Sequence, residues 1–328
     1  MSILILRLSA LGDVIHTFPA VEEMRAALPA ARMVWVVERP YAEMVAAVAP
    51  VDEVISVATR RWRKTPTSGE TWAELGALRR TLRKEGGGAA VDFQGLAKSA
   101  SLGWIAGAKA RFSFDRHSIR EPAALLFSNR RIAVEPGLHV VDINRALARG
   151  VVADLGGTPV PGSAPDLQHF AADLPGELVG IVDDETVVFL PGAGKPAKQW
   201  NIDSFRALAT TVTRDLRLRV LVAWGPGEED LARGVVKEGE GTMAPPTNLR
   251  QLAFLLSRSR LVVGGDTGPL HLAAALGTDV VGLYGPTDPR RNGPYGQIDR
   301  CVTPEGGRGT MDAIDVESVA ARVREILE

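Results

Sequence analysis

Residues 261–275 read LVVGGDTGPLHLAAA, a short apolar run followed by a glycine-rich turn and an apolar helical pattern. The run Leu261–Gly264 has the length and composition of a buried strand. Pro269 suits the first turn of a helix, because its missing N–H would have no partner there, and the helical pattern continues to Leu276. A strand that enters a helix through a tight loop is the repeating unit of a parallel sheet.

The same alternation recurs along the chain. In the first half, strands are predicted at Ile3–Leu8, Met33–Val37, Val54–Val57 and Ala89–Phe93, with helices at Val14–Ala27 and Thr71–Lys84. In the second half, strands are predicted at Thr186–Leu190, Arg219–Ala223, Leu261–Gly264 and Val280–Tyr284, with helices after Asp203 and at Glu228–Glu238, Leu249–Ser257, Pro269–Leu276 and Asp315–Leu327. Each half therefore predicts a doubly wound α/β sheet with helices on both faces.

The length of the chain indicates two domains. Its 328 residues exceed the roughly 250–300 at which a single core stops growing. Residues 155–185 are rich in Gly, Pro and acidic groups, as a linker would be, so we expect domains at 1–165 and 166–328. Such sheets bind ligands at the carboxyl ends of their strands, which predicts a site in the loops around a cleft between the two domains.

The composition excludes an integral membrane protein. It holds 45% hydrophobic and 23% charged residues, and no apolar run approaches the roughly 20 residues that a spanning helix needs. Any membrane contact is therefore expected to be peripheral. The N-terminus lacks the pattern of a secretory signal and the only cysteine is Cys301, so we expect a cytoplasmic protein.

Charge is divided unevenly between the two halves. Residues 1–165 carry 21 Lys and Arg against 16 Asp and Glu, whereas residues 166–328 carry 17 against 23. This asymmetry favours an anionic partner for the first half, and an accident of surface composition is the alternative. Nucleic acid is a poor candidate, because the net charge is −1 and no aromatic stacking module is recognisable.

The first strand–helix loop holds Gly12 and Asp13. A carboxylate at a helix start can be a cap that accepts backbone N–H bonds, or it can be a reactive group in the predicted site. Dinucleotide binding is disfavoured because the loop has one glycine where the G-x-G-x-x-G pattern needs three.

Three loops of the second half could hold a nucleotide diphosphate. Asp266-Thr267-Gly268 opens a helix, where backbone N–H groups suit phosphate, while Asp266 suits sugar hydroxyls. Residues 191–200 carry Lys195 and Lys198 beside two glycines, without the order of a Walker loop. After Trp224, the carboxylate of Glu228 could accept from ribose hydroxyls. In each loop the alternative is an ordinary cap, core or surface residue.

Cations gather in two segments of the first half. Residues 60–64 read RRWRK, and residues 118–122 read SIREP. Arginine is favoured where phosphate or carboxylate groups are bound in a bidentate manner, so both segments could bind an anionic ligand.

Taken together, these motifs resemble the lipopolysaccharide heptosyltransferases, glycosyltransferase family 9, over nearly the whole chain. The resemblance is carried by separate motifs in the family's order, namely Ser9–Thr17, Arg60–Lys64, Asp92–Leu96 with Lys98-Ser99, Arg120-Glu121-Pro122, Lys198 with Trp200, Asp266-Thr267-Gly268 with His271, and Tyr284–Pro289. The resemblance implies a GT-B architecture, with two Rossmann-like domains facing across a cleft. It implies that the N-terminal domain binds the acceptor and the C-terminal domain binds ADP-heptose.

The resemblance also implies the reaction. It is transfer, with inversion, of L-glycero-D-manno-heptose from ADP-heptose to the Kdo of Kdo2-lipid A, by an enzyme peripherally associated with the inner membrane and without metal or cofactor. Asp13 would be the catalytic base. The donor residues would be Lys198, Glu228, Asp266, Thr267, Gly268, His271, Ala193 and Gly194. The acceptor residues would be Ser9, Gly12, Arg60, Arg61, Arg63, Lys64, Gln94, Lys98 and Arg120.

Two departures from the family pattern bear on the donor loops. Ala193-Gly194 stands where some relatives have hydroxyl residues, and the loop after Trp224 differs in length, which affects the role of Glu228. Three alternatives stay open. They are a sibling such as heptosyltransferase II that extends an already heptosylated core, a nicotinamide-dependent oxidoreductase, and a lipid-binding protein without catalysis.

Overall fold

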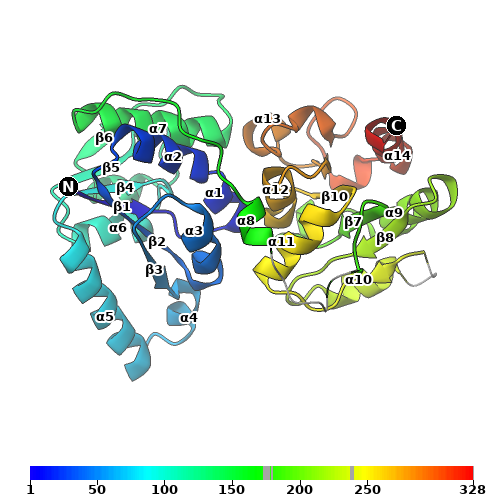
Figure 1. Cartoon of the computed structure of the whole chain (residues 1–328), viewed down its shortest axis with the longest axis horizontal. Coiled ribbons are helices and arrows are strands. Elements are labelled where there is room, and N and C mark those ends of the chain that lie inside the picture. The colour runs from blue at the N-terminus through cyan, green and yellow to red at the C-terminus, as the bar shows by residue number, and fades with distance from the viewer. Residues whose placement is uncertain (173–177, 179, 237–239, 328) are drawn as a thin grey trace. The chain divides into compact units, whose positions relative to one another are not determined.

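A computed structural model describes residues 1–172, 178, 180–236 and 240–327. The chain divides into two compact units, Met1–Pro165 and Asp166–Glu328 (Figure 1). Within the described ranges, no helix is both long and apolar enough to cross a membrane.

The first unit is built on a six-stranded parallel sheet in the order β3-β2-β1-β4-β5-β6. The strands are β1 (Ser2–Leu6), β2 (Arg32–Glu38), β3 (Glu53–Val57), β4 (Ala89–Asp92), β5 (Ala110–Phe114) and β6 (Arg130–Ile132). β1 and β2 lie in the middle and are almost wholly buried, which explains their continuous apolar sequences. The first four strands were predicted to within two residues at each end, whereas β5 and β6 were not predicted.

Helices cover both faces of this sheet. α2 (Phe18–Ala27) and α7 (Val140–Asp154) pack on each other on one side, and α5 (Gly69–Glu85) lies on the other side with α6 (Ala97–Ile105) (Figure 1). Leu82 of α5 and Leu102 of α6 share one core cluster with strand residues such as Leu4. The shorter helices are α1 (Leu11–Ile15), η1 (Arg39–Tyr41), α3 (Ala42–Val48), α4 (Thr59–Lys64) and η2 (Pro122–Leu126).

One helix prediction was wrong. The segment predicted as a single helix, Val14–Ala27, is two helices, because α1 ends at Ile15 and α2 begins at Phe18. Pro19 lies in the first turn of α2, and a proline there cannot donate to a preceding turn, so the helix restarts. The short α1 is consequently a separate element that carries Asp13.

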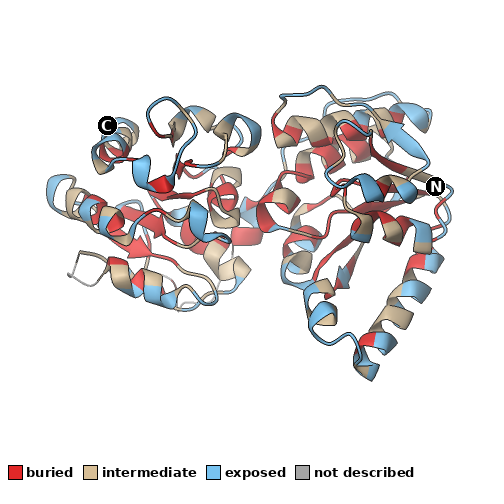
Figure 2. Cartoon of the chain, turned by 180° about the vertical axis from the view of Figure 1, so that it is seen from behind, coloured by how far each residue is buried: buried red, intermediate tan, exposed pale blue. Residues whose placement is uncertain are grey.

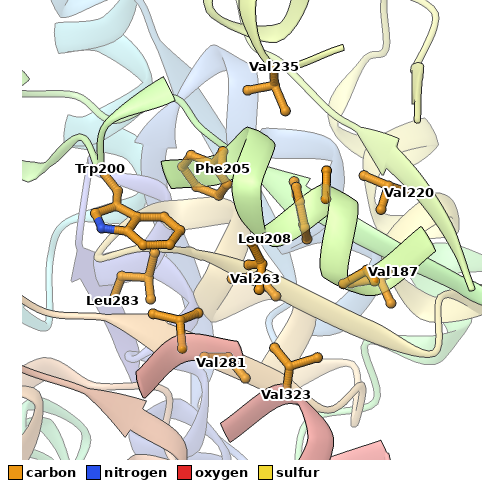
Figure 3. Close-up of a cluster of buried hydrophobic side chains, with 14 of the residues drawn as sticks. Val187, Trp200, Phe205, Leu208, Val220, Val235, Val263, Val281, Leu283 and Val323 are labelled. Atoms are coloured by element: carbon orange, nitrogen blue, oxygen red, sulfur yellow. The ribbon is translucent and has the colours of Figure 1, made fainter. Parts of the chain in front are cut away.

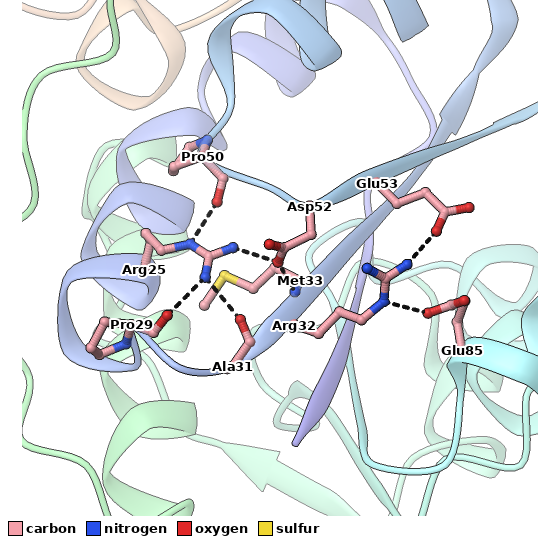
Figure 4. Close-up of polar contacts among 9 residues, drawn as sticks. All are labelled: Arg25, Pro29, Ala31, Arg32, Met33, Pro50, Asp52, Glu53 and Glu85. Atoms are coloured by element: carbon pink, nitrogen blue, oxygen red, sulfur yellow. Dashed lines mark hydrogen bonds and ion pairs between the residues drawn. The ribbon is translucent and has the colours of Figure 1, made fainter.

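The base of the first sheet is fixed by two arginines (Figure 4). The Arg25 guanidinium lies 2.7 Å from the Asp52 carboxylate, which in turn accepts the Met33 N–H at 2.7 Å. Arg32 Nε lies 2.8 Å from a carboxylate oxygen of Glu85. These contacts lie at the amino ends of β2 and β3, away from the loops at the carboxyl ends.

The second unit repeats the topology in the order β12-β11-β10-β7-β8-β9, with all neighbours parallel. The strands are β7 (Thr186–Leu190), β8 (Arg219–Val222), β9 (Thr242–Met243), β10 (Leu261–Gly265), β11 (Val280–Leu283) and β12 (Cys301–Val302). Counted from its own first strand, this is the same 3-2-1-4-5-6 order as in the first unit. The short edge strands β9 and β12 were not predicted.

The helices of the second unit bury a core centred on aromatic side chains (Figure 3). The Phe205 ring lies 5.0 Å from Trp200 and 5.5 Å from Phe189, measured between ring centroids. The helices are α8 (Gln168–Ala171), η3 (Pro196–Lys198), α9 (Ile202–Thr210) with the π-helical η4 (Thr211–Asp215), α10 (Glu229–Val235), α11 (Leu249–Arg258), α12 (Gly268–Ala275), α13 (Pro289–Asn292), η5 (Ile298–Arg300), η6 (Met311–Ala313) and α14 (Val316–Leu327). The closing helix was predicted to within one residue at its start. The predicted helix Glu228–Glu238 corresponds to α10, and its last residues, 237 and 238, lie outside the described residues.

Candidate active site

Asp13 lies in the third position of α1, at the carboxyl end of the first sheet. Its side chain is 27% exposed, and Oδ2 lies 3.4 Å from Arg120 Nη1. The same oxygen accepts the Ala10 N–H, also at 3.4 Å, near the long limit of a hydrogen bond. Asp13 therefore combines a weak capping role with a carboxylate that is open to solvent and beside a cation.

Arg7, which the sequence did not single out, lies beneath this loop. Its side chain is buried, and Nε donates to Thr17 Oγ1 at 3.1 Å, while Thr17 Oγ1 donates to the Asp13 carbonyl at 2.8 Å. Burial lowers the pKa of Arg7, whereas the charges of Asp13 and Asp92 raise it. A buried positive charge thus lies close enough to interact with both carboxylates.

Asp92 ends β4 and is buried. Burial raises the pKa of Asp92 to about 6, against hydrogen bonds from Ser99 and from the backbone of Gln94 and Gly95. The Gln94 N–H donates to Asp92 Oδ1 at 3.0 Å. Gln94 Oε1 accepts the Leu8 N–H at 2.9 Å, so the side chain of Gln94 joins the ends of β4 and β1 and is buried.

Gly95, in the loop after β4, makes a backbone contact that holds the segment of Arg120 near Asp13. Gly95 has a φ of +66°, and its carbonyl accepts the Glu121 N–H at 2.9 Å. The Glu121 carboxylate in turn accepts the Ala97 N–H, at the start of α6, at 2.9 Å. Two motifs far apart in the sequence therefore form one loop junction that fixes the segment bearing Arg120.

The cations of α4 do not all face the same way. Burial raises the pKa of the Tyr41 hydroxyl, while Arg60 and the backbone of Leu11 beside it lower that pKa. Burial lowers the pKa of Lys98, with Glu38 opposing this effect and Arg63 and Arg60 adding to it. These interactions bring Arg60, Arg63 and Lys98 together near α1.

Arg61 lies apart from this group. It pairs with Glu70 at 2.6 Å and with Glu74, both of α5. Lys64 is exposed at the end of α4, Ser9 is half-buried, and Gly12 is buried within α1. Of the predicted acceptor residues, Arg120 thus lies beside Asp13, and the charges of Arg60 and Arg63 act on Lys98, whereas Arg61 joins α4 to α5.

In the second unit, Asp266 follows β10 and is the centre of a polar network. Its Oδ2 accepts from Lys198 Nζ and, at 2.9 Å, from Asn292 Nδ2, and Oδ1 lies 3.3 Å from His271 Nε2. Burial raises the pKa of Asp266, but hydrogen bonds from His271 and Lys198 outweigh burial and lower the pKa to about 2. Asn292 was missed, because nothing in its local sequence indicates that it reaches another loop.

Beside this network, polar groups without partners surround the start of α12. Thr267 precedes the helix, and its hydroxyl is buried without a hydrogen bond to any described residue. The Thr287 hydroxyl, from the loop after β11, is in the same condition. Because the Gly268 N–H lies at a helix N-terminus, this arrangement suits a phosphate group.

Glu228 packs on the glycine-rich loop after β7. A side chain at Gly192 would place its Cβ 2.1 Å from the Glu228 carboxyl carbon, so only glycine allows this approach. Glu228 Oε2 also accepts the Gly225 N–H at 2.9 Å. Ala193 accepts from Gln199 Nε2 at 3.4 Å through its carbonyl, and Gly194 has open space around its Cα. The structure thus brings three predicted donor residues together.

In the described part of the chain, no group of three or more His, Cys, Asp or Glu residues could hold a metal ion. Cys301 is unpaired, and burial raises the pKa of its thiol to about 12.

Comparisons with known proteins agree with this architecture. The family model for glycosyltransferase family 9 (heptosyltransferase) matches residues 75–312. Lipopolysaccharide heptosyltransferase 1 of Escherichia coli is 36% identical over 303 residues, covering 90% of this chain and 92% of the relative.

Two solved structures are similar over almost their whole length. The E. coli heptosyltransferase WaaC with ADP aligns with a TM-score of 0.84 and 32% identity, covering 99% of this chain and 100% of that one. The same enzyme with ADP-2-deoxy-2-fluoro heptose aligns with a TM-score of 0.81 and 33% identity, covering 99% of each chain. The chain therefore belongs to glycosyltransferase family 9, the heptosyltransferases, and has their α/β GT-B fold with two parallel six-stranded sheets.

Proposed function

We propose that this glycosyltransferase moves L-glycero-D-manno-heptose from ADP-heptose to the Kdo of Kdo2-lipid A in the lipopolysaccharide inner core, with inversion at the anomeric carbon. The observation that carries the proposal is Asp13, an accessible carboxylate held beside Arg120 and above the buried Arg7. The names of the relatives support heptosyl transfer and an ADP-linked donor.

The donor diphosphate would bind at the start of α12. The free N–H groups of the helix and the hydroxyls of Thr267 and Thr287 offer hydrogen bonds that phosphate oxygens can accept. Lys198 would stabilise the charge that grows on the diphosphate as the glycosidic bond breaks, with Asp266 and His271 orienting the ammonium group. Glu228 would accept from the ribose. We propose no metal or cofactor, since Lys198 and the helix supply the positive charge.

The acceptor would bind through the cations near Asp13. The charges of Arg63 and Arg60 lower the pKa of Lys98 and Glu38 opposes them, so an anionic ligand would add a further favourable partner for these cations. Kdo carboxylates and lipid A phosphates are such anions. Lys64 and Arg120 would add further positive charge to this contact. Ser9, Gly12 and Gln94 would fix the conformation of the loops, and Arg61 would hold α4 in place through its ion pair with α5. The enzyme would act at the inner face of the cytoplasmic membrane as a peripheral protein.

In the reaction, Asp13 would remove the proton of the attacking Kdo hydroxyl. The hydroxyl oxygen forms the new bond to the anomeric carbon while the bond to the diphosphate oxygen breaks on the opposite side, and ADP leaves with the electron pair. Arg120, 3.4 Å from the Asp13 carboxylate, and the buried Arg7 give this carboxylate positively charged surroundings.

The test is heptosyl transfer with purified enzyme, ADP-heptose and Kdo2-lipid A. Asp13→Asn should lower kcat by about 10²- to 10⁴-fold with nearly unchanged ADP affinity in calorimetry, because the base acts only in the chemical step. Asp142→Asn, an exposed carboxylate of the same unit on α7, is the control and should keep full activity. Full activity of Asp13→Asn would contradict the proposal.

Two further arms separate the alternatives. Transfer only to an acceptor that already carries heptose would identify the sibling reaction. Tight binding of NAD without binding of ADP would indicate an oxidoreductase, which contradicts the proposed donor.

A further inference from the structure

Three large apolar side chains of the first unit are exposed, on two helices that contact each other and on a 3-10 helix beside them. Trp72 of α5 is 65% exposed, Trp104 of α6 is 60% exposed, and Leu126 of η2 is 83% exposed. Of the six tryptophans of the chain, all within the described residues, only these two are exposed. Burying an exposed tryptophan is favourable, so such a grouping indicates a surface that is covered in use.

The three segments lie on the same side of the sheet. Leu82 of α5 and Leu102 of α6 contact the same core cluster, so the two helices cover one face (Figure 1). α6 also packs against η2, and the Trp104 ring lies 6.3 Å from that of Phe127, between centroids. We name the outward sides of α5, α6 and η2 the α5–α6 surface.

Cations also lie on the α5–α6 surface, in the second half of α5. Arg79, Arg80, Arg83 and Lys84 lie in the second half of α5 and are exposed. Most of this helix is coloured as exposed or intermediate in Figure 2. None of the four forms a hydrogen bond or ion pair with another described residue. The acidic residue that ends this helix, Glu85, is buried and paired with Arg32, so it does not neutralise them.

Four unpaired cations in the second half of α5, with exposed tryptophans on α5 and α6, match the chemistry of an anionic bilayer surface. Tryptophan rings prefer the interface between acyl chains and head groups, and Lys and Arg are attracted to anionic head groups. A second copy of the chain would fit poorly, because a two-fold contact brings the same four cations against themselves. Nucleic acid would pair with the cations and leave Leu126 exposed.

We propose that the α5–α6 surface docks the enzyme on an anionic phospholipid bilayer. The surface is continuous with the acceptor segment, because α4 is joined to the first turns of α5 by Arg61–Glu70 at 2.6 Å and by Trp62 Nε1 to Glu74 Oε2 at 2.6 Å. Docking would therefore hold the cations of α4 beside the membrane. This last step rests on the proposed function, since it assumes a lipid-anchored acceptor, whereas bilayer binding itself does not.

The experiment is cosedimentation of the full chain with vesicles of phosphatidylcholine alone or with 30% phosphatidylglycerol. The wild type should bind the anionic vesicles at least tenfold more tightly, with weaker binding at high salt. One variant replaces the apolar groups, as Trp72→Ser, Trp104→Ser and Leu126→Ser. The other replaces the cations, as Arg79→Gln, Arg80→Gln, Arg83→Gln and Lys84→Gln. Both should lose tenfold or more in partitioning.

The matched control removes four exposed cations from the second unit, Arg214→Gln, Arg217→Gln, Arg219→Gln and Arg233→Gln. It changes the net charge equally and should bind like the wild type. Transfer to a deacylated, water-soluble acceptor should remain normal in both surface variants, which checks their folding and keeps the two proposals separate.

Equal binding to both kinds of vesicle, or loss of binding in the control as large as in the cation variant, would overturn the docking surface. Retained binding in either surface variant would do so as well. Normal vesicle binding without any heptosyl transfer would instead remove the proposed function and leave the surface in place.

Discussion

Each unit places an aspartate at the carboxyl end of the fourth strand of the same topology, yet the pKa values of the two carboxylates are shifted in opposite directions. Asp92 ends β4 and Asp266 follows β10, each the fourth strand of its sheet in the 3-2-1-4-5-6 order. Burial raises the pKa of Asp92 to about 6, whereas His271 and Lys198 overcome burial and lower the pKa of Asp266 to about 2. The shared topology determines where the carboxylate lies, and the residues of the neighbouring loops determine whether its pKa is raised or lowered.

The difference lies in the cation that each unit provides after its first strand. Arg7, after β1, donates to Thr17 and Asn144 and has no direct hydrogen bond to Asp92. Lys198, after β7, contacts Asp266 directly. In the first unit, one buried positive charge therefore interacts with two carboxylates without contacting Asp92 directly, which suits proton transfer. In the second unit, a lysine contacts the carboxylate directly, close to the proposed position of an anion.

The largest effect is expected from removing the cation of the second unit. Lys198→Ala should lower kcat/KM for heptosyl transfer by about 10²- to 10³-fold, or about 3–4 kcal/mol, because the leaving diphosphate loses its charged partner in the transition state. It should also weaken ADP binding in calorimetry. Lys195→Ala, an exposed lysine of the same loop, should change kcat/KM less than fivefold. A larger loss of kcat/KM in Lys195→Ala would indicate that Lys195, and not Lys198, contacts the diphosphate.

The second-largest effect is expected on the free energy of unfolding, when Asp92 of the first unit is replaced. Because the pKa of Asp92 is raised on folding, the folded protein holds its proton more tightly, and stability falls as the pH rises from about 4 to above 6. Two pKa units correspond to about 3 kcal/mol. Asp92→Asn should remove this penalty, so that urea unfolding shows a more stable variant at pH 7 and a smaller difference at pH 4.5.

Two results would contradict this expectation. A variant less stable than the wild type at pH 7 would mean that ionised Asp92 is stabilised by Arg7 more than burial destabilises it. A difference independent of pH would mean that the side-chain amide acts through packing alone. Ser113→Ala, a buried polar residue of the neighbouring β5, provides a control without titration.

The sequence predicted the central strands well and the edges poorly. β7 was predicted at its observed bounds, because a strand buried on both faces is a continuous apolar run. β6, β9 and β12 have two or three residues each, too few for a pattern, and Arg111 interrupts β5. Short polar edge strands are common because they discourage edge-to-edge association, and this makes them hard to recognise.

For the site, local patterns indicated groups at loop starts but not their partners. Asp13 and Asp266 stand out because each begins a helix after a strand. Arg7, Asn292 and Thr287 do not stand out, because their significance comes from neighbours far away in the sequence. The roles assigned to the individual site residues remain predictions that the kinetic experiments test.

A smaller effect on stability is expected at low pH, where Asp266 of the second unit becomes protonated. Because the pKa of Asp266 is lowered on folding to about 2, its contribution of about 2 kcal/mol is present above pH 4 and is lost as the pH falls towards 2. About 1 kcal/mol should disappear between pH 5 and pH 3 in urea unfolding. Asp266→Asn should lack this part of the pH dependence. An unchanged slope in the variant would show that the network of Lys198 and His271 does not stabilise the ionised carboxylate.

The smallest effect is expected at Gly192 of the second unit, which lies against Glu228 at the proposed ribose position. In Gly192→Ala, the new Cβ would lie 2.1 Å from the Glu228 carboxyl group, so this flexible side chain must move away from the proposed ribose position. We expect KM for ADP-heptose to rise about fivefold, or about 1 kcal/mol, with kcat nearly unchanged, because ribose binding is equal in the ground and transition states. Gly194→Ala meets open space and should leave both constants unchanged. Equal behaviour of the two variants would remove Glu228 from the donor site, since only the first displaces it.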